Sequence, residues 1–80
     1  MDKEVIRSVK LQFSHREAAQ VLSELQKISL SSIASRSEKN LLNAHLAILK
    51  LAEGDLQQVS YYVGCARKDF RDVIYWAGKK

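Results

Sequence analysis

The chain has 80 residues, 46% of them hydrophobic and 28% charged, a composition that excludes a disordered tail and fits one small globular domain over residues 1–80. Three glycines and no proline leave few turn signals, so the sequence predicts an all-α fold, a small bundle of three or four helices. The formal net charge of +4 is shared evenly between the two halves of the chain, so no basic tail marks a polyanion-binding segment.

The N-terminal segment, residues 1–13, is compatible with two periods. One set of apolar residues alternates as in a strand, and another fits helical spacing about as well. A lone strand finds no partner elsewhere in this chain, so it would pair with another copy. We expect an extended arm or a short strand here. The alternating set is Val5, Val9, Leu11 and Phe13, and the helical set is Ile6, Val9 and Phe13.

Two amphipathic helices are predicted next, over residues 14–29 and 37–53. Ser14 and Glu17 have the spacing of a capping box, and Ser37 is placed to cap the second helix. The serine-rich segment 29–37 between them competes for backbone hydrogen bonds and is the predicted linker. The second helix has the wider apolar face, and we expect it to be the central helix of the bundle.

A tight connection and a third amphipathic segment complete the chain. Gly54 is placed to end the central helix, and Asp55 is placed to cap the next one at once. Residues 55–77 have apolar positions that step by three and four along the whole segment, the pattern of a packed helix. Gly64 and Asp69 leave two alternatives open, one helix of about 33 Å or two helices with a break near 64–69. The apolar positions are Leu56, Val59, Val63, Ala66, Phe70, Val73 and Ala77.

Two segments in this half, LAEGDL at 51–56 and DFRDVIYWA at 69–77, carry a family resemblance. Over residues 41–77 the chain resembles a family of small bacterial helical proteins of uncharacterised function. The resemblance implies a short, soluble, stand-alone helical protein. It implies no activity, cofactor or site residue.

Candidate catalytic and metal-binding residues are few. His15 and His45 have no second ligand at the spacing of a helical metal site, and we expect His45 to be half-buried with one hydrogen bond. Cys65 has no histidine partner and is expected to fill space. Asp69 and Asp72 lie three residues apart among basic residues, which favours an exposed ion-pair cluster. The sequence therefore predicts no catalytic residue, no metal, no cofactor and no enzyme activity.

One pattern favours nucleic-acid binding, a helix-turn-helix with its turn at Gly64 and its reading helix around 67–77. That helix would present basic and aromatic side chains to phosphates or guanine edges. Ala66 stands where the helix needs a Ser or Thr cap, and two aspartates would face the DNA with the wrong charge. DNA binding is therefore the alternative function. The presented residues are Arg67, Lys68, Arg71 and Tyr75, opposed by Asp69 and Asp72.

The function we expect is protein–protein interaction through a helical surface, because exposed Trp and Tyr beside Arg are typical of interfaces. So small a core would also gain from pairing with a second copy, so a homodimer is a further expectation. The single cysteine suits a reducing cytoplasm, and no apolar run is long enough to span a membrane. The candidate interaction surface is Arg67, Lys68, Arg71, Asp72, Tyr75 and Trp76.

Overall fold

Helices make up the regular secondary structure of residues 1–33 and 36–79, the part of the chain that the computed structural model describes. The prediction of an all-α fold is confirmed. The predicted number of three or four helices is wrong, because five α-helices are formed within the described residues. They are α1 (Lys3–Gln12), α2 (His15–Leu25), α3 (Glu38–Ala52), α4 (Leu56–Lys68) and α5 (Phe70–Lys79), with a short 3-10 turn, η1 (Leu30–Ser32).

The N-terminal segment forms α1, so the expected arm or strand is wrong. Asp2 caps the helix, because its Oδ1 accepts a hydrogen bond from the Glu4 backbone N–H at 2.8 Å. Val5 and Val9, one turn apart, are fully buried, whereas Leu11 is 81% exposed. The alternating pattern failed because it included Leu11. A helix satisfies its own backbone hydrogen bonds, which a lone strand in this chain could not do.

Helix caps are where the sequence predicts best. The Ser14 hydroxyl accepts from the Glu17 N–H at 3.3 Å, and the Ser37 hydroxyl accepts from the Asn40 N–H at 3.2 Å. Helix α2 ends at Leu25, earlier than predicted. The backbone after it makes 3-10-type hydrogen bonds between residues three apart, and this turn buries Ile28. Residues 34–35 of the predicted serine linker lie outside the described residues.

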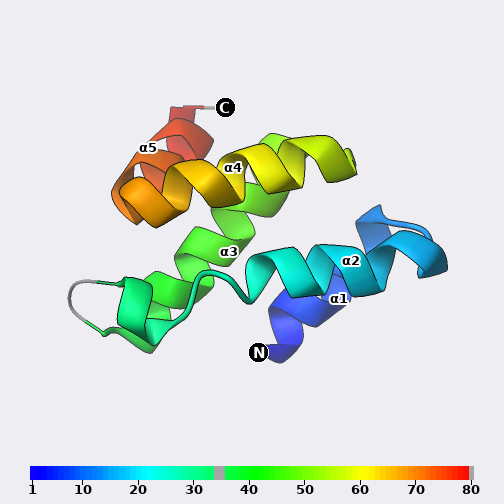
Figure 1. The fold of residues 1–80 in the computed structure, drawn as a ribbon, viewed down its shortest axis with the longest axis horizontal. Coiled ribbons are helices and arrows are strands. Elements are labelled where there is room, and N and C mark those ends of the chain that lie inside the picture. The colour runs from blue at the N-terminus through cyan, green and yellow to red at the C-terminus, as the bar shows by residue number, and fades with distance from the viewer. Residues whose placement is uncertain (34–35, 80) are drawn as a thin grey trace.

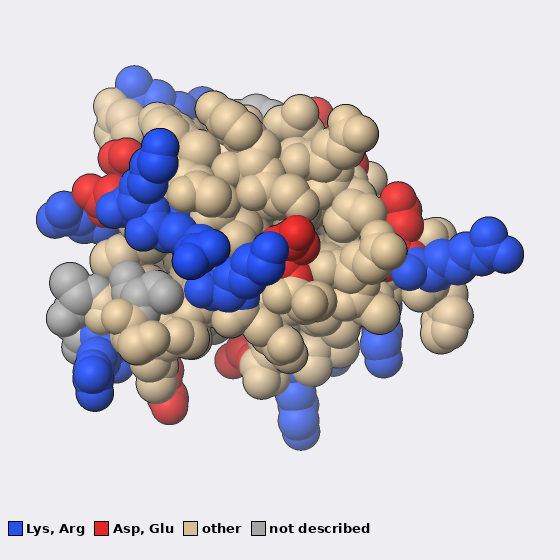
Figure 2. All heavy atoms as spheres, in the orientation of Figure 1, with Lys and Arg blue, Asp and Glu red and all other residues tan. Residues whose placement is uncertain are grey.

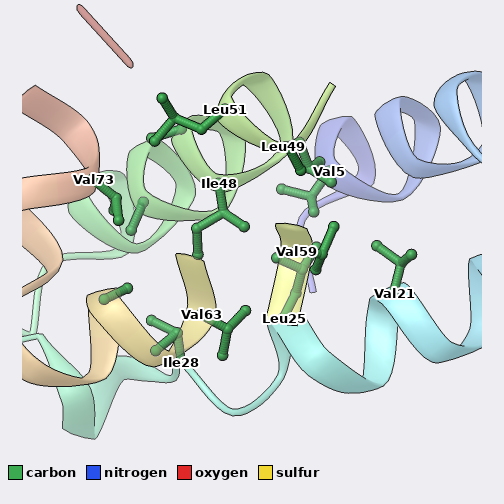
Figure 3. Packing of buried hydrophobic residues seen from close by; sticks show 14 of the residues in the cluster. Val5, Val21, Leu25, Ile28, Ile48, Leu49, Leu51, Val59, Val63 and Val73 are labelled. Atoms are coloured by element: carbon green, nitrogen blue, oxygen red, sulfur yellow. The ribbon is translucent and has the colours of Figure 1, made fainter. Parts of the chain in front are cut away.

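Helix α3 is the central helix, as predicted. It packs against α1, α4 and α5, and α2 packs against α4 (Figure 1). Buried side chains from all five α-helices point toward one another around it (Figure 3). Within the labelled group, Val5 comes from α1, Val21 from α2, Ile48 from α3, Val59 from α4 and Val73 from α5.

The segment 55–77 is broken, which resolves the alternative left open by its apolar pattern. Helix α4 continues through Gly64 to Lys68, and the break falls at Asp69, whose backbone is extended (φ −157°, ψ 105°). A straight helix would carry Phe70 and Val73 away from the molecule. The break turns α5 back, so that Phe70 and Val73 are buried and α5 packs against both α3 and α4.

A single copy closes this core. The folded chain exposes 5318 Å² of surface, close to the value of about 4,900 Å² expected for a compact monomer of 9.1 kDa. The apolar faces that motivated the homodimer are therefore largely covered within one chain. Homodimerisation stays a prediction.

The glycines supply a paired test of these helix boundaries. Gly54 has φ +80°, and a Cβ there would lie 3.4 Å from the Gln12 carbonyl oxygen, whereas a Cβ on Gly64 would meet nothing within 4 Å. We expect Gly54→Ala to lower the free energy of unfolding by about 1–2 kcal/mol and Gly64→Ala to raise it by about 1 kcal/mol. Urea unfolding midpoints measure both. A loss of stability in Gly64→Ala would contradict the continuous α4 and restore a turn at that residue.

Candidate functional site

The α4–α5 hairpin carries the candidate site, and Asp69 sets its geometry. The Asp69 Oδ1 accepts the Arg71 backbone N–H at 3.0 Å, as an N-cap residue does. Each carboxylate oxygen also accepts one N–H of the Arg71 guanidinium at 3.0 Å. These hydrogen bonds from Arg71 hold the pKa of Asp69 below its usual value. Asp69 thus ends α4, begins α5 and holds the Arg71 side chain across the turn.

Three aromatic rings form a cluster across the two helices, which we call the aromatic cluster: Tyr61, Tyr62 and Trp76. The Tyr61 and Tyr62 ring centroids are 5.1 Å apart, and those of Tyr62 and Trp76 are 6.4 Å apart, both pairs edge to face. Tyr62 and Trp76 each lie seven residues from Asp69. In one straight helix they would be separated by about 21 Å along the axis, so the break at Asp69 creates the cluster.

The six candidate residues predicted from the sequence are all exposed, but they are not equivalent. Trp76 is 38% exposed and packs against Tyr62, and Tyr75 is 60% exposed with the Lys79 ammonium 4.7 Å from its ring centroid. Arg67 lies about 140° round α4 from Tyr62, because successive helical residues rotate by about 100°. Arg67 therefore lies on the side of α4 away from the aromatic cluster. The remaining five are Lys68, Arg71, Asp72, Tyr75 and Trp76.

The surface predicted from the sequence does not include Tyr61, Tyr62 and Lys79. Their contacts to other residues of the hairpin place them on it. The equal spacing of Tyr62 and Trp76 from Asp69 was the available signal, but it gains this meaning only when the helix breaks at Asp69. We call the resulting set the hairpin surface. It consists of Tyr61, Tyr62, Lys68, Arg71, Asp72, Tyr75, Trp76 and Lys79.

Charge around this site is sparse and mixed. In the face shown by Figure 2, basic and acidic side chains are interspersed and separated by uncharged areas. Helix α4 has no charged residue before Arg67. The hairpin therefore combines an uncharged aromatic face with a charged end.

His45 has a structural position rather than a place in this site. It is almost fully buried on α3, and its Nε2 lies 2.9 Å from the Leu25 carbonyl oxygen and 3.0 Å from that of Ile28. The Leu25 carbonyl belongs to the last residue of α2, and the Ile28 carbonyl belongs to the turn that follows it. Burial lowers the pKa of His45, which favours the neutral ring donating its Nε2–H to both oxygens. The sequence predicts a half-buried His45 with one hydrogen bond, whereas the structure buries it almost fully and gives it two.

A second polar contact joins α2 to α4. The Ser60 hydroxyl donates to a Glu24 carboxylate oxygen at 3.0 Å, and the Lys27 ammonium lies 2.8 Å from the other oxygen. The hydrogen bond from Lys27, followed by that from Ser60, lowers the pKa of Glu24. This contact joins α2 to the side of α4 that carries Ser60, about 160° round the helix from Tyr62.

Among the described residues, no group of three or more His, Cys, Asp or Glu side chains is arranged to hold a metal ion. Cys65 is partly exposed, one turn from Tyr61, and its hydrogen bond to Tyr61 raises the pKa of that phenol. The turn expected at Gly64 for a helix-turn-helix is not formed, because α4 passes through that residue. None of the helices in the described part is long and apolar enough to cross a membrane.

An open groove lies beside η1 and the N-terminal half of α3. Its volume is about 480 Å³, and apolar side chains form most of its wall. It adjoins a second groove of about 360 Å³ whose rim carries Asp2 and Glu38. His45 faces both grooves with a ring already hydrogen-bonded to two carbonyls. The residues shared by both grooves are Met1, Leu30, Leu41 and His45.

The fold and this surface define the chain as a small all-α protein whose exposed aromatic residues gather on a C-terminal helical hairpin. It matches no protein-family model, no curated protein and no solved structure. The resemblance to small bacterial helical proteins stays a prediction from residues 41–77.

Proposed function

We propose that the protein is a small, non-catalytic interaction module that binds a protein partner through its hairpin surface. The observation that carries the proposal is the gathering of exposed aromatic side chains on one hairpin. Tyr61 and Tyr75 are each 60% exposed and Trp76 is 38% exposed, whereas the exposed Leu11 belongs to α1. Tyrosine, tryptophan and arginine are the residues that most often dominate binding energy at protein interfaces.

The hairpin surface is also organised before any partner arrives. Trp76 is held against Tyr62, Tyr75 lies beneath the Lys79 ammonium, and the Arg71 guanidinium is held by Asp69. Side chains that are already fixed lose less conformational entropy on binding. Such preorganisation supports a binding role.

A site-specific photo-crosslinker tests the proposal in the native cells. We expect p-benzoylphenylalanine in place of Tyr75 to give a discrete adduct with a partner protein. The same group in place of Leu11 should give none, although Leu11 is 81% exposed on α1. Adding Trp76→Ala to the Tyr75 probe should weaken the adduct. The same adducts from both positions, or none from position 75, would refute the hairpin surface as the binding site.

Duplex DNA is the competing partner. Arg71 and Lys68 favour DNA binding. Asp69, just before α5, and Asp72, in its first turn, lie near them in the sequence and would repel phosphates. We therefore rank a protein partner first. We also propose that the module acts in the cytoplasm, since a single cysteine suits a reducing compartment.

A further inference from the structure

We propose that the hairpin surface recognises an acidic peptide segment that also carries a large apolar side chain, an inference that rests on the proposed function. The aromatic cluster would take the apolar side chain. Lys68, the last residue of α4, and Lys79, the last residue of α5, would take the carboxylates. Each half of this recognition follows from a separate feature of α4 and α5.

The hairpin carries more basic than acidic residues, although the two halves of the chain have the same net charge. From Leu56 to Lys79 there are four basic residues and two acidic ones, and the first acidic residue is Asp69. Asp69 is bound by Arg71. Arg67 faces away from the aromatic cluster, which leaves Lys68 and Lys79 against Asp72 on the hairpin surface. Residues 1–33 and 36–55 carry eight basic and seven acidic residues. Net positive charge is thus concentrated on the hairpin and attracts an acidic partner.

The distance between the aromatic cluster and Lys68 determines how far apart the apolar and acidic side chains of the partner must be. Lys68 follows Tyr61 by seven residues, so both lie on the same side of α4, about 10 Å apart along its axis. A partner helix would match them with an apolar residue and a carboxylate two turns apart. The same helix could place further carboxylates near Lys79, since α5 packs alongside α4.

A peptide fits this surface better than a nucleic acid or a second copy does. A protein that binds through phosphates can make about 6–10 contacts with them. The hairpin surface offers Lys68 and Lys79, with Asp72 among them and Arg71 held by Asp69. The rings of the aromatic cluster pack edge to face, so they form no platform for a run of stacked bases. Two copies facing each other here would bring like charges together.

A matched series of peptides tests the inference. Three synthetic amphipathic helices would share the same leucine and phenylalanine positions and carry Glu, Gln or Lys at their polar positions. Binding would be followed by the backbone amide resonances of the isotopically labelled full chain, at low and at physiological salt. We expect the Glu peptide to bind about tenfold more tightly than the Gln peptide, to shift α4 and α5 resonances, and to weaken as salt rises.

Charge reversal supplies the matched control. The double variant Lys68→Glu, Lys79→Glu should lose the preference for the Glu peptide and bind the Lys peptide instead. The double variant Arg7→Glu, Lys10→Glu makes the same change in net charge on exposed residues of α1 and should behave as the unaltered protein. Equal effects of the two double variants would overturn the inference, because the net charge alone would then explain the binding.

The remaining outcomes separate this inference from the proposed function. If the Glu and Gln peptides bind the hairpin equally, the hairpin surface is still a peptide-binding site, but the proposed preference for acidic peptides is wrong. If the Glu peptide does not bind, or if an oligonucleotide of equal length binds more tightly at the same salt, the inference is overturned. Resonance shifts confined to α1 would refute the hairpin surface itself.

Discussion

Ile48→Ala should lower the free energy of unfolding by about 2–5 kcal/mol, the largest effect we expect from a single truncation in this chain. Ile48 is fully buried in the middle of α3, among side chains from the helices around it (Figure 3). Removing its branched end leaves a cavity that the surrounding helices cannot fill. Because a domain of this length has only about 4–12 kcal/mol of stability, the variant should lose a large share of it.

Leu11→Ala is the control for this prediction. It also truncates a large aliphatic side chain to alanine, but Leu11 is 81% exposed on α1. Its effect should stay within about 0.5 kcal/mol. Urea unfolding followed by circular dichroism measures both variants. Similar losses in the two would contradict the central position of α3, and a large loss in Leu11→Ala alone would contradict the exposed face of α1.

The sequence predicts the parts of this fold that depend on local chemistry. Ser14, Ser37 and Asp55 cap helices where their residue types and spacing place them, because a cap is decided within a few residues. The start of the chain could not be decided locally. Its apolar residues fit two periods, and the choice depends on whether Val5 and Val9 reach the core together.

The break at Asp69 shows the same limit. An apolar pattern stepping by three and four is the same for one long helix and for two shorter helices that both face α3. The cap at Asp69 is a local signal, but its use depends on the burial of Phe70 against α3 and α4. The aromatic cluster also depends on this break. Exposure of Tyr75 and Trp76 is predictable from the helical period, whereas the contact of Tyr62 with Trp76 is not.

His45→Leu should lower the free energy of unfolding by about 1–3 kcal/mol near neutral pH. The leucine fills the space but removes the His45 donor from the Ile28 carbonyl oxygen, whereas the Leu25 carbonyl oxygen keeps the Ile28 backbone N–H at 3.0 Å. A buried carbonyl that loses its partner costs more than the hydrogen bond itself contributed. His15→Leu is the control, because His15 is exposed at the first residue of α2. Equal small losses in both variants would contradict the buried contact.

The pH dependence of stability gives His45 a second, independent signature. Burial lowers its pKa from the ordinary value of 6.5, so the unfolded chain binds the proton more readily than the folded chain. The stabilisation is therefore complete above about pH 6.5, and it declines as the pH falls toward the lower folded pKa, by up to about 1.4 kcal/mol per pH unit. Urea midpoints between about pH 7.5 and 5, above the range where carboxylates titrate, should decline as the pH falls in the unaltered chain and in His15→Leu. His45→Leu should remove that decline, and an unchanged slope in this variant would assign the proton uptake to another group.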